Sequence, residues 1–223
     1  MVLMETRIEK IKKGRCILPA MKKISGDTAL FTHLPDGSLA FLLSDGMGKG
    51  RRAASESREV AETLRKLLRE GMPAAVAIKE VNRQMVESKR EGYSFATVDL
   101  TIIDPLKGRA RFYKMGAATS FLVRGDQVRR VEHPALPVGI VPKLKLRAVS
   151  VDVKPGDIIV MVSDGITEAD RRDMEARWLQ MALCNIPYGM GPVNLAEAIV
   201  GLALEKYGRR EKDDLTAMVM IIE

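Results

Sequence analysis

The spacing of apolar residues changes along the chain, and these changes predict the order of the secondary structure. Two short apolar runs at 28–32 and 38–43 flank Pro35-Asp36-Gly37. Proline presets φ and glycine accepts a positive φ, so this tripeptide is typical of a tight turn and the two runs predict a β-hairpin. Apolar residues then recur at helical spacing over 54–68, and again from Pro73 onward. This spacing predicts two consecutive helices.

From residue 95 the pattern becomes that of short strands. The predicted strands lie at 95–103, 109–114, 120–124, 127–131, 148–153, 157–162 and 215–222. The run at 157–162 is almost wholly apolar, as expected for a strand that is covered on both faces. Two further helices are predicted at 172–184 and 194–206, and the segment 4–12, bounded by Gly14, is interpreted as a first strand.

This order of elements predicts an α+β fold in which two antiparallel sheets pack face to face, with a helix pair outside each sheet. No stretch rich in Ser, Gly and Pro or in one charge interrupts residues 1–223. We therefore expect a single domain, with residues 1–20 as an N-terminal segment.

Composition excludes several function classes. Of the 223 residues 46% are apolar, which is enough for a real core, and 36 Lys plus Arg against 29 Asp plus Glu give a net charge of +7. Aromatic residues make up only 4% and are not interleaved with the basic ones, so nucleic-acid binding by base stacking is poorly supported. The dispersed positive charge is typical of a solvated surface, or of one that docks an acidic or phosphorylated partner.

Location and redox setting follow from what the sequence lacks. No apolar run approaches the roughly 20 residues that span a bilayer, and residues 1–23 have no apolar signal core. Cys16 and Cys184 form no Cys-x-x-Cys pair, so neither a disulfide framework nor a zinc site is indicated. We expect a cytoplasmic chain without a membrane segment.

The candidate chemistry lies in aspartates at the ends of apolar strands. They are Asp27, Asp45, Asp164, Asp213 and Asp214, and two of them stand in the tripeptide Ser-Asp-Gly. Any one alone is most often a turn residue that bonds its own backbone. Brought together, such carboxylates would repel one another unless divalent cations held them. Oxygen ligands select Mg²⁺ or Mn²⁺, and a pair of such ions activates water for phosphate ester hydrolysis.

The glycine-rich segment 46–50 has two interpretations. Its spacing matches neither the dinucleotide fingerprint nor the phosphate-binding loop that ends in Gly-Lys-Ser or Gly-Lys-Thr. It could be only a flexible turn into a helix. Alternatively, the absence of side chains lets the carbonyl of Gly46 approach a metal, with the helix N-terminus near a phosphate. His33 and His133 are far from the aspartate motifs in sequence and are assigned to no site.

Four motifs together resemble the metal-dependent, type 2C serine/threonine protein phosphatases. They are Ser25-Gly26-Asp27, Ser44-Asp45-Gly46-Met47-Gly48-Lys49-Gly50, Ser163-Asp164-Gly165-Ile166 and Asp213-Asp214-Leu215-Thr216. More narrowly, Asp-Gly-Met-Gly-Lys-Gly, the stretch 114–128 and Leu136-Pro137-Val138-Gly139-Ile140 resemble the phosphatase domains of the stage II sporulation protein E (SpoIIE) family.

The resemblance implies an αββα sandwich with two Mn²⁺ or Mg²⁺ ions in a central cleft. Asp45 would bridge both ions, the Gly46 carbonyl would bind one, and Asp27, Asp164 and Asp213 would complete the ligands, with Asp45, Asp164 and Asp213 as the catalytic set. Asp214 stands where the family often has Asn, and is an alternative ligand or a support for the ligands. Met47 replaces the His of many relatives, and Lys22 replaces their phosphate-binding Arg, which makes Lys22 the candidate phosphate contact.

The resemblance to the sporulation family also implies a substrate and a setting. The substrate would be the phosphorylated anti-sigma factor antagonist, whose dephosphorylation frees a sporulation sigma factor. In that family the domain is the C-terminal part of a membrane protein, so this chain would be its cytoplasmic catalytic fragment. By resemblance, the helices within 51–90 would couple partner binding to the metal site; by composition alone they are a helical hairpin. A homodimer is compatible with these features.

Two rival functions remain from the sequence alone. One is a noncatalytic partner-binding module of the same fold, which would dock an acidic partner through Lys and Arg. The other is a nucleic-acid binder, which would show a steep salt dependence. Phosphate release from a phosphoserine protein, with and without Mn²⁺, separates the first rival from a phosphatase.

Overall fold

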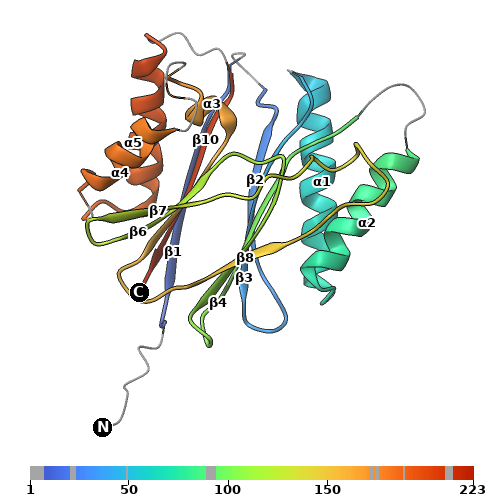
Figure 1. Cartoon of the computed structure of the whole chain (residues 1–223), viewed down its shortest axis with the longest axis horizontal. Helices are drawn as coiled ribbons and strands as arrows, with labels where there is room; N and C mark the ends of the chain where they lie inside the picture. Colours follow the sequence, from blue (N-terminus) through green and yellow to red (C-terminus); the bar gives the residue numbers. More distant parts are fainter. Residues whose placement is uncertain are drawn as a thin grey trace.

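The computed structural model describes residues 8–20, 24–48, 50–88, 94–170, 173, 176–187, 189–208 and 213–223. Two five-stranded antiparallel sheets lie side by side in the middle, and helices cover their outer faces (Figure 1). The predicted α+β fold with two packed sheets is therefore confirmed.

The order of strands differs between the two sheets. Sheet I contains β1 (Ile11–Leu18), β10 (Leu215–Ile222), β9 (Ile158–Val162), β6 (Ser120–Arg124) and β7 (Gln127–Val131), in that order. Sheet II contains β2 (Asp27–His33), β3 (Leu39–Asp45), β4 (Val98–Asp104), β5 (Arg109–Met115) and β8 (Ala148–Asp152). The first and the last strand of the chain, β1 and β10, are neighbours in sheet I and pair along the whole length of both.

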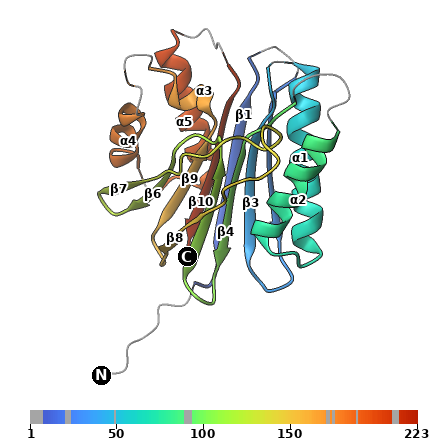
Figure 2. The ribbon, with the colours of Figure 1, turned by 45° about the vertical axis from the view of Figure 1, so that its right-hand side comes forward.

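Each sheet carries helices on its outer face (Figure 2). Sheet II is covered by α1 (Arg51–Arg69) and α2 (Ala74–Glu87), and sheet I by α4 (Arg177–Cys184) and α5 (Pro192–Lys206). A single turn, α3 (Asp164–Thr167), follows β9 directly. The helix α1 forms because its apolar residues recur at helical spacing, which buries Val60, Leu64 and Leu68 in one stripe against sheet II.

The layer between the sheets is apolar at one end and polar at the other. Alternation along β3 sends Leu42 toward the helices and Phe41 and Leu43 toward the opposite sheet. The same period places Asp45 on the inner face where β3 ends. Residues that occupy the inner face at this end of the sandwich by the same alternation are Asp27, Asp99, Lys114, Ser120, Ser163 and Thr216. The fold therefore gathers polar groups at one end of an otherwise apolar layer.

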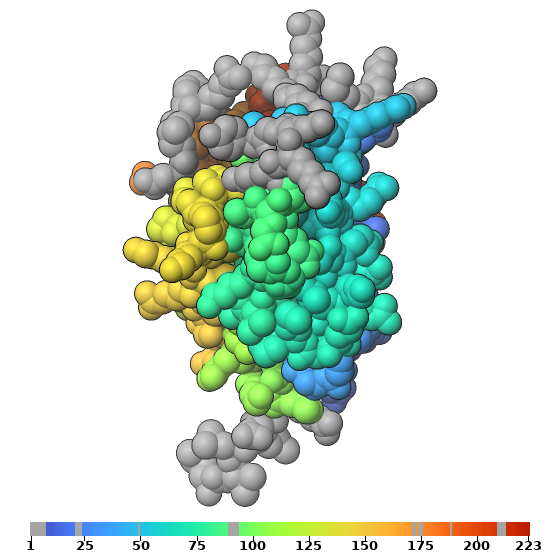
Figure 3. All heavy atoms as spheres, turned by 90° about the vertical axis from the view of Figure 1, so that its right-hand side faces the viewer, coloured from blue at the N-terminus to red at the C-terminus, as the bar shows by residue number. Residues whose placement is uncertain are grey.

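A long connection between β7 and β8 is fastened to α2 by one buried side chain. The amide of Asn82 donates to the carbonyl of Val141 (2.9 Å), and its Oδ1 accepts from the backbone N–H of Gly139 (2.9 Å). Figure 3 shows the face that α1 and α2 form, with this connection in yellow beside them. A backbone bridge between Ala96 and Val138 continues from this connection toward the end of β3.

The first strand departs from the sequence prediction. It runs over Ile11–Leu18 and passes through Gly14, instead of occupying 4–12 and ending there; residues 1–7 lie outside the described residues. The reason is a tertiary contact between this strand and α5. A Cβ at Gly14 would collide with the backbone of Pro192 and Val193, so glycine here allows α5 to lie directly on the strand.

The helix predictions need two corrections. The helix predicted at 172–184 begins at Arg177, and residues 171, 172, 174 and 175 are outside the described part of the chain. The turn α3 was not predicted. In the described residues, no helix is both long and apolar enough to cross a bilayer.

Candidate metal centre

Two of the predicted site residues face each other across neighbouring strands. Asp27 opens β2 and Asp45 ends β3, and the antiparallel register pairs them directly. Asp27 is buried, with only 6% of its surface exposed, and Asp45 is partly exposed. Oδ2 of Asp27 is buried and accepts no hydrogen bond from any described group.

The first Ser-Asp-Gly motif is fixed by the neighbouring strand. Ser44 donates its hydroxyl hydrogen to the carbonyl of Thr97 (2.7 Å), and the backbone N–H of Asp45 donates to Thr97 Oγ1 (2.8 Å). A Cβ at Gly46 would overlap the carbonyl of Ala53, so this glycine is needed for the close approach of α1. The motif therefore orients Asp45 through both of its neighbours.

The second Ser-Asp-Gly motif repeats this arrangement in sheet I. Ser163 donates to the carbonyl of Asp214 (3.2 Å) and accepts from the backbone N–H of Thr216 (3.0 Å). A Cβ at Gly165 would overlap that same carbonyl and lie 3.2 Å from Cβ of Asp213. The Asp213–Asp214 backbone is therefore packed against the motif that carries Asp164.

Asp214 has a different environment from the other aspartates. Its Oδ2 accepts from the backbone N–H of Gly26 (2.6 Å) and its Oδ1 from that of Ala20 (2.7 Å). A Cβ at Gly26 would lie 3.1 Å from Oδ2 of Asp214 and 3.4 Å from Oδ1 of Asp45. The carboxylate of Asp214 therefore ties the segment before β2 to the start of β10, between the two sheets.

The charges of the five aspartates act on one another. Burial, together with the charges of the other four, raises the pKa of Asp45 to about 9. Burial raises the pKa of Asp27 to about 7, with the charges of Asp214 and Asp164 adding to it and nearby hydroxyls opposing it. Partial loss of hydration and the charge of Asp213 raise the pKa of Asp164. The fold thus collects negative charge that favours a proton or a cation.

These residues suit a hard divalent cation, such as Mg²⁺ or Mn²⁺. All the candidate side-chain donors are carboxylate oxygens, and one of these oxygens, Asp27 Oδ2, has no hydrogen-bond partner among the described residues. Across the described ranges, no three Asp, Glu, His or Cys side chains converge on one point. A Mg²⁺ or Mn²⁺ ion in this arrangement would therefore take water molecules for much of its coordination, as Mg²⁺ usually does in proteins.

Sequence reasoning missed a buried ion pair beside the site. Lys114 Nζ donates to Asp99 Oδ2 (2.6 Å) and to Ser120 Oγ (2.8 Å), and Ser120 Oγ donates to the same carboxylate oxygen (2.8 Å). Burial lowers the pKa of Lys114, and the carboxylate of Asp99 opposes this shift. The available signal was the presence of charged residues within apolar strands; their pairing becomes evident only from the strand register. Thr97 gave no separate signal, because a threonine is ordinary in a strand.

The structure describes only one of the two positions at which the sequence departs from the phosphatase pattern. Lys22, the candidate phosphate contact, lies outside the described residues. Met47 follows the first Ser-Asp-Gly motif with 40% of its surface exposed, and its backbone N–H donates to the carbonyl of Phe95 (3.1 Å).

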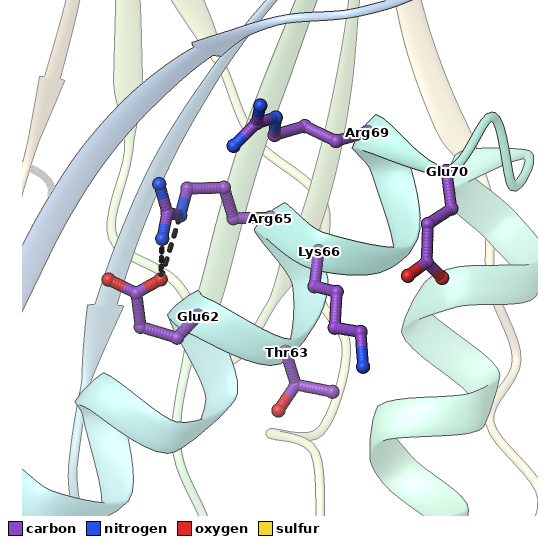
Figure 4. Close-up of a pocket in the computed structure, with 6 residues that line it drawn as sticks. All are labelled: Glu62, Thr63, Arg65, Lys66, Arg69 and Glu70. Carbon is purple, nitrogen blue, oxygen red and sulfur yellow. Dashed lines mark hydrogen bonds and ion pairs between the residues drawn. The ribbon is translucent and has the colours of Figure 1, made fainter.

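A wider hollow elsewhere has the character of a solvated helix face. Figure 4 shows it on α1, where its lining consists of Glu62, Thr63, Arg65, Lys66, Arg69 and Glu70. Arg65 and Glu62 form an ion pair there (2.5 Å). All six residues come from α1 and its C-terminal cap, and such i,i+3 pairs are typical of exposed helix surfaces. The hollow is therefore not a second active-site candidate.

Comparison with known proteins gives a family match over most of the chain. Residues 35–223 match the family described as stage II sporulation protein E (SpoIIE). Stage II sporulation protein E of Bacillus subtilis (strain 168) is 32% identical over 201 residues, which cover 90% of this chain and 24% of that protein. The chain thus spans about a quarter of the length of this curated relative.

The fold comparison agrees with this match. A solved structure of the PP2C phosphatase domain of SpoIIE from Bacillus subtilis, with a fragment of its regulatory domain, superposes with a TM-score of 0.89 at 30% identity. The match covers 98% of this chain and 64% of that one. RsbX in complex with magnesium, at 16% identity and a TM-score of 0.72 over 96% of each chain, shares the fold alone.

Proposed function

This chain belongs to the stage II sporulation protein E family, and we propose that it is a metal-dependent serine/threonine protein phosphatase that hydrolyses phosphoserine on a regulatory protein. The observation that carries the proposal is the gathering of five aspartates from both sheets at one end of the sandwich, where burial and the charges of neighbouring aspartates raise the pKa values of Asp27, Asp45 and Asp164. Repulsion among these carboxylates destabilises the folded chain unless a proton or a cation neutralises it.

The proposal assigns a role to each aspartate. Asp45 would be shared by two Mn²⁺ or Mg²⁺ ions, and the carbonyl of Gly46 would bind one of them. The remaining ligands would be Asp27, Asp164 and Asp213, with Asp45, Asp164 and Asp213 closest to the chemistry. Asp214, whose oxygens already accept two backbone N–H groups, would act mainly by holding Gly26 in place. Bound ions of this kind lower the pKa of a water molecule and so supply hydroxide near neutral pH.

The chain's own residues then orient this chemistry. Ser44 and Thr97 hold the backbone on both sides of Asp45, and Ser163 does the same for the strand end that carries Asp164. Met47 has no acidic proton to donate, so the leaving serine oxygen would take its proton from solvent or from Lys22. Lys22 is proposed as the phosphate contact on the basis of its place in the sequence motif alone.

A protein is the substrate that suits this centre. The net charge of +7 suits a partner that carries phosphate. The family match favours the phosphorylated anti-sigma factor antagonist. We place the reaction in the cytoplasm, in a longer protein that is anchored at the membrane, with a homodimer compatible with the fold.

The test is phosphate release from the phosphoserine form of such an antagonist protein, with Mn²⁺, with Mg²⁺ and after chelation. We expect release that depends on the added ion, and a higher kcat/KM for the folded phosphoprotein than for p-nitrophenyl phosphate. A noncatalytic module of the same fold would bind the phosphoprotein and release nothing. Full activity after exhaustive chelation would contradict the metal-dependent mechanism.

A further inference from the structure

A small cavity lies between the two sheets, next to the proposed metal centre. It has a volume of about 20 Å³, and its polar lining includes Asp45, Thr97, Asp99, Ser163 and Asp164. A polar cavity of this size has room for one water molecule. Because Asp45 and Asp99 both line it, the cavity connects a proposed metal ligand with the buried ion pair of Lys114.

Asp99 presents an unsatisfied acceptor there. The residue is 1% exposed, and its Oδ2 already accepts from Lys114 and Ser120. Its Oδ1 is buried and accepts no hydrogen bond from any group in the described part of the chain. A buried acceptor left without a donor destabilises the fold, so a donor in the cavity is strongly favoured.

The chemistry of the lining selects a neutral donor. The charge of Asp99 is already balanced by Lys114 at 2.6 Å, so the site needs a hydrogen bond and not a second cation. A water molecule has two hydrogens, one for Asp99 Oδ1 and one for a second acceptor that lines the cavity.

We propose that Asp99 is a positioning residue for Asp45: it holds one water molecule in the cavity, and this water donates its second hydrogen to the Asp45 carboxylate. Lys114 and Ser120 keep Asp99 in place from two different sheets, since Lys114 lies on β5 and Ser120 on β6. The network thus couples the contact between the sheets to the orientation of a cation ligand. The inference rests on the proposed function in one respect: it takes Asp45 to be a ligand of the metal ion.

The first test is direct observation. A crystal structure of the unmodified chain, at a resolution that shows ordered water, should contain one water within about 3 Å of Asp99 Oδ1 and of an Asp45 oxygen. A cavity without that water, or a water that reaches Asp99 but not Asp45, would overturn the proposal.

The second test measures Mn²⁺ binding by calorimetry, independently of catalysis. In the double variant Asp99→Leu/Lys114→Met both charges are removed together, a replacement that is often neutral for stability. We expect its Kd for Mn²⁺ to rise about 10-fold or more, as for other changes behind a metal ligand. Thr101→Val is the matched control, because Thr101 lies on the same strand as Asp99 but does not line the cavity, and its hydroxyl bonds no group in the described part of the chain; its Kd should stay at the parent value.

The outcomes separate this inference from the proposed function. A folded double variant that binds Mn²⁺ as tightly as the parent overturns the positioning role, even if the parent is an active phosphatase. If the double variant does not fold, the crystal structure of the parent chain decides: the bridging water supports the positioning role, and its absence overturns it. A parent that shows the water and the expected loss of Mn²⁺ affinity, but releases no phosphate, supports this inference and contradicts the proposed function.

Discussion

Asp27 and Asp45 occupy directly paired positions on β2 and β3, with both side chains on the inner face of the sheet. Like charges at directly opposed positions destabilise a pair of strands. Burial raises the pKa of Asp27 to about 7, and burial together with the charge of Asp27 and the other aspartates raises the pKa of Asp45 to about 9. Without a cation, the folded chain therefore retains protons that the unfolded chain releases near pH 4.

This relationship predicts an unusual pH dependence of stability. The folded pKa of Asp45 lies above its ordinary value of 3.8, so the folded state binds more protons than the unfolded state between about pH 4 and 9. The metal-free chain should lose stability as pH rises through this interval. With Mn²⁺, which displaces those protons, the gain in Tm should grow with pH. Thermal unfolding from pH 5 to 8.5, with chelator and with Mn²⁺, measures both trends.

The matched control for that experiment is Asp45→Asn. Other titrating groups contribute to the pH dependence of the parent, and the difference between the two chains isolates the contribution of Asp45. The metal-free slope should be flatter in the variant. Identical slopes would show that Asp45 titrates normally in the folded chain.

Asp214 should behave as a structural acceptor more than as a repelling charge. In Asp214→Ala the backbone N–H groups of Gly26 and Ala20 lose their acceptor, and the N–H of Gly26 is in a buried contact. We expect a loss of about 1–3 kcal/mol in metal-free urea unfolding. Asp214→Asn, which keeps one oxygen, should recover part of the loss. Unfolding of Asp214→Ala at the parent's urea midpoint would show that these two hydrogen bonds are dispensable.

Much of the fold was predictable because it depends on local periodicity. The hairpin around Pro35-Asp36-Gly37, the helices over 51–87 and the strand at 215–222 all follow from apolar spacing and turn residues. The extent of β1 was not predictable, since Gly14 is explained only by α5, which is distant in sequence.

The candidate site shows the same division. The aspartates could be found because charged residues at the ends of apolar strands are unusual. Thr97 and the pair Asp99–Lys114 could not be assigned to the site, because their roles depend on which strands pair and in what register. Strand pairing is a long-range property that a single sequence does not display.

Gly165 should be required for both stability and metal binding. In Gly165→Ala the new Cβ would overlap the carbonyl of Asp214 and press on Cβ of Asp213. Such overpacking costs about 1–3 kcal/mol, and it would displace a proposed ligand, so Mn²⁺ affinity should fall as well. Gly201→Ala is the control: its Cβ would meet no atom of the described residues within 4 Å outside its own helix, and alanine favours a helix. Parent-like unfolding and Mn²⁺ binding in Gly165→Ala would contradict this packing argument.

Variants of Asp45 and Asp213 distinguish two interpretations of these aspartates, a catalytic site and a set of turn residues. Replacing either by Asn preserves shape and removes a charge that cations need, so Mn²⁺-dependent turnover should fall by at least about 100-fold. Metal-free stability should hold or rise, because one contribution to the repulsion among the aspartates is gone.

Asp104 is the matched control, since its Oδ1 accepts from the backbone N–H groups of Leu106 (3.1 Å) and Lys107 (3.0 Å) in a turn far from the site. Asp104→Asn should lower Tm slightly and leave turnover unchanged. The measurement is thermal unfolding in chelator beside turnover of a phosphoserine protein in Mn²⁺ for all three variants. If Asp45→Asn and Asp213→Asn instead behaved like Asp104→Asn, with lower melting temperatures and normal turnover, these aspartates would be turn residues and the metal centre would have to be placed elsewhere.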